Sequence, residues 1–150
     1  MDIFDCHLIR FPGNSDYSGQ LTFMEENKNI PFKIKRVYYL SHVPEDSKRG
    51  THAHKKLNQV LIALSGKFEV ILDNGYQKKN YLLNNPQEGL YMGAMLWREL
   101  KNFSPGAICL VLASELYDVD DYVRDYNEFL SLTHGTRTIT HLKKTAIADN

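Results

Sequence analysis

The chain has 150 residues, enough for one domain that buries about two thirds of the surface exposed by the unfolded chain. Lysine plus arginine number 18, as do aspartate plus glutamate, so no overall positive field favours nucleic acid or a membrane surface. The two cysteines lie far apart in sequence, which fits a reducing compartment better than a disulfide framework. Any anion site must therefore come from a local cluster of cations.

The N-terminal residues 1–5 lack the basic region and the apolar stretch of a signal peptide. No apolar run approaches the length needed to cross a bilayer. We therefore expect a soluble, cytoplasmic protein.

Short strands in close succession are predicted for the middle of the chain. Residues 34–40 are β-branched and aromatic, residues 60–64 are apolar, and residues 67–73 alternate with period two. Ser65-Gly66 predicts a hairpin turn between the last two segments, and Asn74-Gly75 is the strongest hairpin signal of the sequence. Residues 81–83, 89–100 and 107–113 continue the series.

This pattern predicts an all-β sandwich or barrel rather than alternating strands and helices. Only residues 120–130 predict a helix, because Tyr122, Tyr126 and Phe129 have helical spacing. The polar residues from Ser131 onward predict a loosely ordered tail. We therefore expect one domain over residues 1–130 and a tail over residues 131–150.

The most informative motif is the pair His52 and His54, which follows Arg49. Residues two apart in a strand point the same way, so both imidazoles should converge on one pocket. Arg49 and Lys55 or Lys56 are close enough in sequence to give this pocket a positive field. Such a pair can supply two metal ligands, or it can transfer protons near neutral pH.

The downstream residues argue against a metal. A metal-binding cupin follows the first pair with a glutamate and adds a later histidine, whereas here Gln59 and Arg98 stand in those two places. A guanidinium has no lone pair to offer and repels a divalent ion, and a neutral amide is a poor ligand. Two of the four groups that such a site needs are missing. The sequence therefore predicts no metal and no other cofactor.

Several motifs, in the same order, resemble the sugar nucleotide 3,4-ketoisomerases, which are cupin-fold enzymes acting on dTDP-4-keto-6-deoxyglucose. The resemblance implies a cupin-type jelly roll, a homodimer without metal, and a 3-keto product. It also implies a downstream pyridoxal-phosphate aminotransferase that makes a 3-amino-3,6-dideoxyhexose for lipopolysaccharide or another glycan. The resemblance covers roughly residues 18–130 and rests on residues 26–32, 34–39, 49–56, 89–91, 97–99, 112–118 and 121–124.

The chemistry of such an isomerase fits these residues. His52 is the predicted carbon base, because an imidazole can take the C3 proton and return it to C4 on one face of the sugar. Tyr38 and His54 are the candidates for moving the proton between the two oxygens. Tyr38 and Tyr39 alternate in direction, so only one of them can face the pocket. Arg98 is expected to stabilise the enediolate.

The cations near the motif are candidates for binding the diphosphate, since guanidinium matches phosphate oxygens in a bidentate way. They could equally be solvated surface charges, and Trp97 could be a core residue. Two other functions stay open, a 3,5-epimerase of the same sugar nucleotides and a non-catalytic cupin sugar-binding module. The predicted substrate-binding residues are Arg36, Arg49, Lys56, Gln59, Tyr91, Trp97 and Arg98.

Two family positions bear on the configuration of the product at C4. The position matching Arg98 is Arg in members that give the gluco product and His in those that give the galacto product. The position before the glycine matching Gly19 is aromatic in the first branch and Arg in the second. Arg98 therefore favours gluco, whereas Ser18, with Tyr17 one residue earlier, half matches the second marker.

Overall fold

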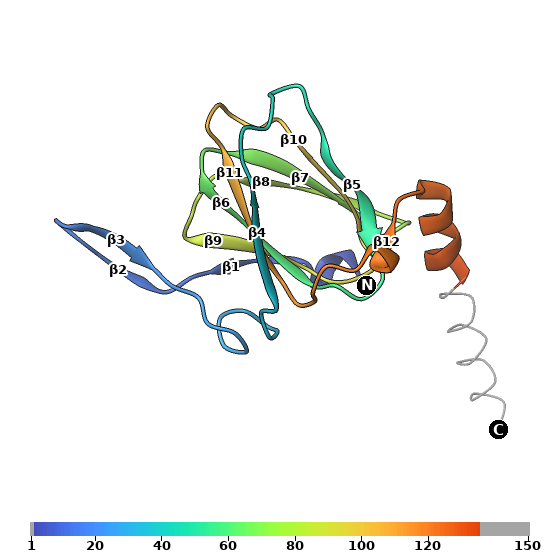
Figure 1. Ribbon diagram of the computed structural model, residues 1–150, viewed down its shortest axis with the longest axis horizontal. Helices are drawn as coiled ribbons and strands as arrows, with labels where there is room; N and C mark the ends of the chain where they lie inside the picture. The colour runs from blue at the N-terminus through green and yellow to red at the C-terminus, as the bar shows by residue number, and fades with distance from the viewer. Residues whose placement is uncertain (1, 136–150) are drawn as a thin grey trace.

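The computed structural model describes residues 2–135 and contains two five-stranded antiparallel sheets that face each other (Figure 1). The first sheet has the order β1 (His7–Arg10), β9 (Glu88–Met92), β6 (Gln59–Ser65), β11 (Ile108–Ala113) and β4 (Arg36–Leu40). The second has the order β12 (Tyr122–Val123), β5 (Arg49–His54), β10 (Trp97–Lys101), β7 (Phe68–Asp73) and β8 (Lys78–Leu83). This jelly roll confirms the predicted all-β fold class.

The main core lies between the two sheets. Strand β7 shows why: Phe68, Val70 and Leu72 are fully buried, whereas the intervening Glu69 and Ile71 are half-buried. The period-two pattern predicted for this segment is therefore correct. Burial of each such side chain stabilises the fold by about 1.5–3 kcal/mol. Further buried hydrophobic residues come from both sheets, among them Leu61, Leu90 and Val111 of the first sheet and Leu100 of the second.

The two predicted hairpins have different outcomes. Asn74-Gly75 joins β7 to β8, which pair from Asp73 opposite Lys78, so this prediction is confirmed. Ser65-Gly66 does not form a hairpin, because β6 and β7 belong to different sheets. The turn instead carries the chain across the core. Gly66 has φ 66°, and a Cβ there would lie 2.9 Å from the Ala107 backbone.

Residues 89–100 contain two strands rather than one, and these belong to opposite sheets. The chain turns at residues 93–96, where Met95 has φ 59° and its N–H donates to the His54 carbonyl. This turn places Arg98 next to β5, directly opposite His52 in the sheet register. The crossover therefore brings two of the predicted site residues together.

The predicted helix over residues 120–130 is wrong at its start. Val119–Asp121 form a 3-10 helix, β12 follows, and residues 126–135 are α-helical. Pairing of β12 with β5 takes Tyr122 out of any helical pattern. Residues 131–135, which were assigned to the tail, belong to the helix, and residues 136–150 lie outside the described part of the chain. The boundary between domain and tail stays a prediction.

The N-terminal part contains elements that the sequence did not predict. Ile3–Asp5 form a 3-10 helix, and β2 (Gly13–Asp16) pairs with β3 (Gly19–Thr22). These two strands form an arm that projects from the body of the molecule (Figure 1), with Tyr17 fully exposed at its turn. Within residues 2–135, no helix is long and apolar enough to cross a membrane.

Candidate active site

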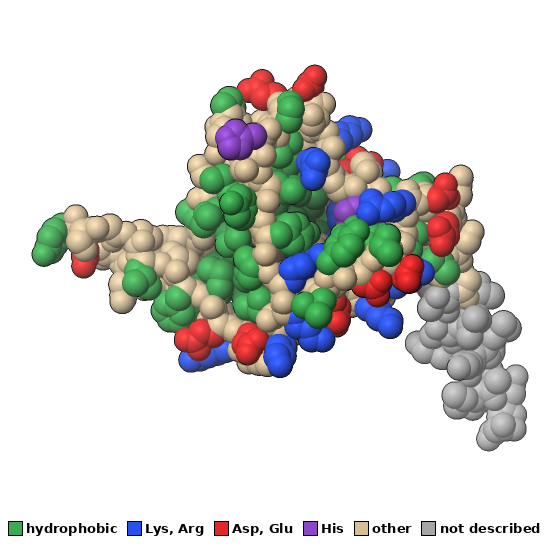
Figure 2. Space-filling model, viewed as in Figure 1, with side chains coloured by type: hydrophobic (Ala, Val, Ile, Leu, Met, Phe, Trp, Pro, Cys, Tyr) green, Lys and Arg blue, Asp and Glu red, His purple; other side chains and the backbone are tan. Residues whose placement is uncertain are grey.

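A cavity of about 580 Å³ opens on one side of the jelly roll, where β4, β5, β10 and β12 contribute side chains. Figure 2 shows a histidine together with several Lys and Arg side chains on this face of the molecule. The lining residues are Arg36, Val37, Tyr38, Leu40, Lys48, Arg49, Gly50, Thr51, His52, Gln59, Leu61, Arg98, Leu100, Val111, Tyr122 and Arg124.

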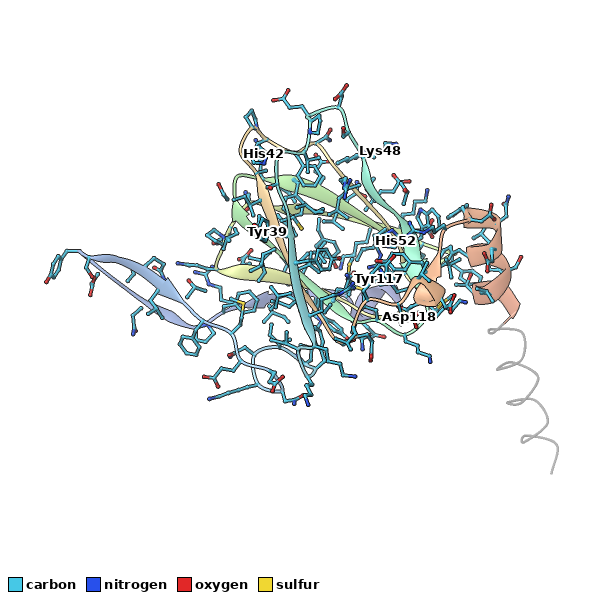
Figure 3. All side chains as sticks on the ribbon, in the orientation of Figure 1. Tyr39, His42, Lys48, His52, Tyr117 and Asp118 are labelled. Atoms are coloured by element: carbon cyan, nitrogen blue, oxygen red, sulfur yellow. The ribbon has the colours of Figure 1, made fainter. Side chains whose placement is uncertain are left out.

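Most of the predicted site residues meet at this cavity. His54 lies directly behind His52 and is buried. Of the two neighbouring tyrosines, Tyr38 faces the cavity, and Tyr39 is largely exposed on the other side of β4. Figure 3 shows Tyr39 and His42 well apart from His52. The predicted residues that line the cavity are Arg36, Tyr38, Arg49, His52, Gln59 and Arg98.

Three predicted binding residues do not line the cavity. Trp97 precedes Arg98 on β10 and points to the opposite face, where its ring lies 5.2 Å from that of Tyr126. Tyr91 packs against a hydrophobic cluster that includes Phe11 and Val60, and its ring lies 5.5 Å from that of His7. The side chain of Lys56 is exposed beyond the end of β5. Within one chain, these residues do not meet His52.

A bulge in β5 orients the first histidine. Gly50 and Thr51 have φ 83° and 51°, and the pairing of β5 with β10 shifts register at this point. The bulge aims the Gly50 carbonyl at His52, whose Nδ1 lies 2.8 Å away. A Cβ at Gly50 would stand 3.0 Å from the Arg98 carbonyl oxygen, so only glycine fits both the φ value and the space.

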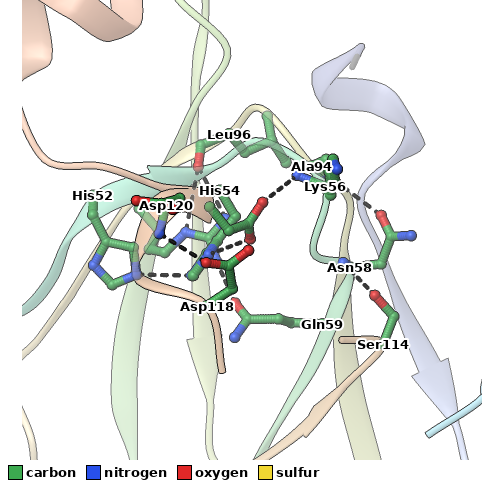
Figure 4. A network of polar contacts seen from close by, with 12 residues as sticks. His52, His54, Lys56, Asn58, Gln59, Ala94, Leu96, Ser114, Asp118 and Asp120 are labelled. Atoms are coloured by element: carbon green, nitrogen blue, oxygen red, sulfur yellow. Dashed lines mark hydrogen bonds and ion pairs between the residues drawn. The ribbon is translucent and has the colours of Figure 1, made fainter. Parts of the chain in front are cut away.

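The two imidazoles converge as the strand alternation predicts. Their Nε2 atoms lie 3.1 Å apart, and the rings are perpendicular at 89°. On its other side, His54 Nδ1 lies 3.0 Å from Asp121 Oδ2, within a buried contact. Figure 4 shows His52 and His54 in this network of polar contacts. The ring of Tyr122 covers the pair, with its centroid 4.9 Å from His52 and 4.4 Å from His54.

Burial and nearby cations make both histidines weak bases. Desolvation, followed by the charge of Arg98, lowers the pKa of His52 from 6.5 to about 4, although its hydrogen bond to Gly50 opposes this shift. Desolvation and the same guanidinium lower the pKa of His54 to about 2. The imidazole facing the cavity is therefore neutral near pH 7, as a general base must be.

A second polar chain runs through Arg98, Gln59 and Tyr38. Arg98 is only 2% exposed, and it donates to Gln59 Oε1 and to the Leu96 carbonyl. Gln59 Nε2 in turn donates to the Tyr38 hydroxyl at 2.8 Å. The two residues at the expected metal-ligand positions thus bind each other.

The protonation of this chain follows from its burial. Desolvation lowers the pKa of Arg98 to about 10, so the guanidinium still carries its charge at neutral pH. Desolvation raises the pKa of Tyr38, against the opposing effect of Arg98, so the phenol keeps its proton. Because Gln59 donates to the phenol oxygen, the Tyr38 O–H is left to donate into the cavity.

Several residues at the site received no role from the sequence. Lys48, Tyr122 and Arg124 line the cavity, and Asp121 holds His54. The guanidinium of Arg124 lies 4.4 Å from the Tyr122 ring centroid. Residues 121–124 did carry part of the family resemblance. Their assignment to a helix concealed that a strand places them beside β5.

Comparisons with known proteins agree with this geometry. The family model described as FdtA: WxcM-like, C-terminal matches residues 4–134. A curated relative, the TDP-4-oxo-6-deoxy-alpha-D-glucose-3,4-oxoisomerase of Aneurinibacillus thermoaerophilus, is 48% identical over 122 residues. The match covers 81% of this chain and 88% of the relative.

Two solved structures are similar over most of their length. The TDP-quinovose 3,4-ketoisomerase WlaRB of Campylobacter jejuni is 48% identical, with 85% of this chain and 98% of that chain covered at TM-score 0.82. A histidine-to-asparagine mutant of the 3,4-ketoisomerase QdtA from Thermoanaerobacterium thermosaccharolyticum, in complex with TDP-4-keto-6-deoxyglucose, is 44% identical. The match covers 87% of this chain and 95% of the QdtA chain, with a TM-score of 0.85. The chain therefore belongs to the FdtA family of sugar nucleotide 3,4-ketoisomerases, as its motifs suggested.

Proposed function

We propose that this chain moves the ketone of TDP-4-keto-6-deoxyglucose from C4 to C3. The observation that carries the proposal is the position of His52, a neutral imidazole that faces the same cavity as the buried Arg98 cation and the Tyr38 phenol. Relatives that are 44% to 48% identical are named for this substrate or for this reaction.

The proposed reaction needs only proton transfers. His52 takes the C3 proton, and the resulting enediolate lies within the field of Arg98, which stabilises its negative charge. His52 then delivers the proton to C4, while the C3 hydroxyl proton passes to the C4 oxygen. Tyr38 lines the cavity and keeps its proton, which supports it as the group beside the oxygens. No oxidant or reductant is consumed.

The cations at the cavity supply a diphosphate subsite. Arg36 lies between two aromatic rings, 5.1 Å from the Tyr38 centroid and 5.7 Å from that of Tyr117. Its Nε is buried without a hydrogen-bond partner among the described residues, so a donor is available for phosphate oxygen. Lys48 and Arg49 also line the cavity. We infer that these three cations hold the nucleotide diphosphate.

Exchange in deuterium oxide separates this proposal from its two rivals. A ketoisomerase labilises the protons at C3 and C4, so we expect deuterium at these carbons and none at C5. A 3,5-epimerase would label C3 and C5 and leave the ketone at C4. A binding module would give no carbon-bound deuterium. Label at C5, or no label together with a ketone that stays at C4, would contradict the proposal.

We expect catalysis to survive removal of metal ions. Gln59 and Arg98 stand in two of the metal-ligand positions and are hydrogen-bonded to each other. Of the four ligands that such a site needs, only His52 and His54 of the motif are then left. Activity should be unchanged after treatment with a chelator. Loss of turnover that one divalent ion restores would contradict this prediction.

We propose that Arg98 favours a product with the gluco configuration, as the family marker indicates. WlaRB, which is 48% identical, is named for quinovose, a sugar with that configuration. Coupling the reaction to a pyridoxal-phosphate 3-aminotransferase should yield a 3-amino-3,6-dideoxyglucose nucleotide with large H3–H4 and H4–H5 couplings. Small couplings would indicate an axial C4 hydroxyl and would show that Arg98 does not decide the outcome. Such an aminotransferase, in the cytoplasm, is the proposed consumer of the product.

We expect a homodimer at micromolar concentration. The β2–β3 arm exposes Tyr17 and Leu21, and β4 is the last strand of its sheet within the described residues, with Val37 and Tyr39 exposed. Such edges and apolar surfaces favour pairing with another chain. Analytical ultracentrifugation should show a dimer. A stable, fully active monomer would contradict this prediction without affecting the proposed chemistry.

A further inference from the structure

Asp121 is a buried carboxylate without a part in the reaction as described so far. Its Oδ1 accepts from the backbone N–H of Lys56 at 2.7 Å, and its own backbone carbonyl accepts from the N–H of Lys55 at 2.9 Å. Its Oδ2 lies 3.0 Å from Nδ1 of His54, and both side chains are at most 9% exposed. The carboxylate is therefore fixed, with one oxygen aimed at the imidazole.

The neighbours of the two imidazoles determine where their protons lie. Nδ1 of His52 faces the Gly50 carbonyl, which can only accept, so this nitrogen carries a proton. Nδ1 of His54 faces the Asp121 carboxylate, which also accepts, so it carries a proton as well. In the neutral rings, both Nε2 atoms are then left with lone pairs. They face each other 3.1 Å apart, at a distance where one shared proton fits.

We propose that Asp121 is a positioning residue that holds His54 as the Nδ1–H tautomer, so that His54 Nε2 accepts a hydrogen bond from His52 once His52 is protonated. The catalytic part of this inference rests on the proposed function. When the C3–H bond breaks, the proton forms an N–H bond at His52 Nε2, the nitrogen with a free lone pair. In the second step the N–H bond at His52 Nε2 breaks, the C4–H bond forms, and both rings are neutral again.

The charges around the pair explain why such support is needed. Arg98, Arg36 and Arg124 all disfavour a proton on His54, and Arg98 and Arg124 disfavour one on His52. Among the described residues, Asp121 is the one carboxylate within ion-pair distance of either imidazole. Its negative charge therefore offsets part of this repulsion when the pair holds the substrate proton.

An asparagine at position 121 should reverse the tautomer. The Lys56 N–H needs an acceptor, so the amide oxygen of Asp121→Asn will face Lys56, and the amide NH₂ will face His54. Nδ1 of His54 must then accept, and its proton moves to Nε2, where it donates to His52. His54 can no longer accept a hydrogen bond from a protonated His52.

The matched control is Asp118→Asn, the same change in the same short segment. Asp118 is exposed and caps the 3-10 helix by accepting from the N–H of Asp120 at 3.0 Å. It does not line the cavity. A loss shared by both variants would report a disturbed 3-10 helix, whereas a loss confined to Asp121→Asn reports the His54 contact.

Imidazole ¹⁵N NMR with histidine-labelled protein, together with kinetics, tests the inference. The wild type should show His54 protonated at Nδ1, and Asp121→Asn should show it protonated at Nε2. The kcat of Asp121→Asn should fall about 10²-fold with KM little changed, while Asp118→Asn behaves as the wild type.

Each contrary outcome has a separate meaning. A wild-type His54 protonated at Nε2 would overturn the inference, even if Asp121→Asn failed to fold. Turnover of a folded Asp121→Asn equal to that of Asp118→Asn would also overturn it. A wild type with the expected tautomer but no ketoisomerase activity would refute the proposed function instead.

Discussion

Replacement of His52 by asparagine should lower kcat by about two to four powers of ten and leave substrate binding nearly intact. The amide is similar in shape and can keep a hydrogen bond to the Gly50 carbonyl, but it cannot take a proton from carbon. The cations and aromatic rings that line the cavity are unchanged. The loss should therefore appear in kcat, and binding of the substrate measured by calorimetry should persist.

The matched control is His42→Asn, because His42 is exposed and lies outside the cavity. It should turn over like the wild type. Near-normal turnover of His52→Asn would move the carbon base to His54 or Tyr38.

The pH dependence gives the same prediction a second readout. A general base acts in its neutral form, so activity is lost as pH falls through its pKa. Since the pKa of His52 is lowered to about 4, the acid limb of kcat/KM should lie well below the 6.5 of an exposed histidine. Circular dichroism at each pH checks that the fold persists. An acid limb near 6.5 would contradict the environment described for His52.

Replacement of Arg98 by methionine should lower kcat by about 10²–10³, the effect of removing one preorganised donor from an oxyanion site. The free energy of unfolding of the variant should differ from that of the wild type by no more than about 2 kcal/mol, because two effects oppose each other. The variant loses hydrogen bonds to Gln59 and Leu96, but it no longer buries a cation. Within residues 2–135, Arg98 forms no ion pair with a carboxylate. Its positive charge therefore remains available to a negative charge that forms in the cavity.

The control for the loss of a guanidinium is Arg10→Met, at an exposed position that bonds Gln87 and Glu88. Both variants should unfold at similar denaturant concentrations, while only Arg98→Met loses activity. An Arg98→Met enzyme with full turnover would remove Arg98 from the chemistry. Severe unfolding would show that the guanidinium is mainly structural.

The fold could be predicted well where buried and exposed side chains follow a regular alternation of apolar and polar residues in the sequence. The alternation of residues 67–73 and the Asn74-Gly75 signal gave β7 and its hairpin with β8 correctly, because both are local properties. Ser65-Gly66 is also a turn signal, like Asn74-Gly75, and yet it connects strands of two different sheets. Which strands pair depends on contacts distant in sequence, and a dipeptide carries no information about them.

The site shows a similar limit. His52 and His54 could be placed together because strand geometry fixes residues two apart, and Tyr38 could be separated from Tyr39 for the same reason. Trp97 and Tyr91 could not be placed, because their side depends on the sheet that each strand joins. Asp121 was missed since its aromatic neighbours have helical spacing, whereas pairing of β12 with β5 overrides that weak preference.

The most direct test is incubation of the protein alone with TDP-4-keto-6-deoxyglucose, followed by NMR of the nucleotide sugar. Migration of the carbonyl is the defining change of the reaction, and neither rival can produce it. The account predicts that the C4 ketone signal declines and that a C3 ketone appears on a 6-deoxyhexose with an intact TDP group. A C4 ketone that stays in place, whether in unchanged substrate or in a C3 or C5 epimer, would contradict it.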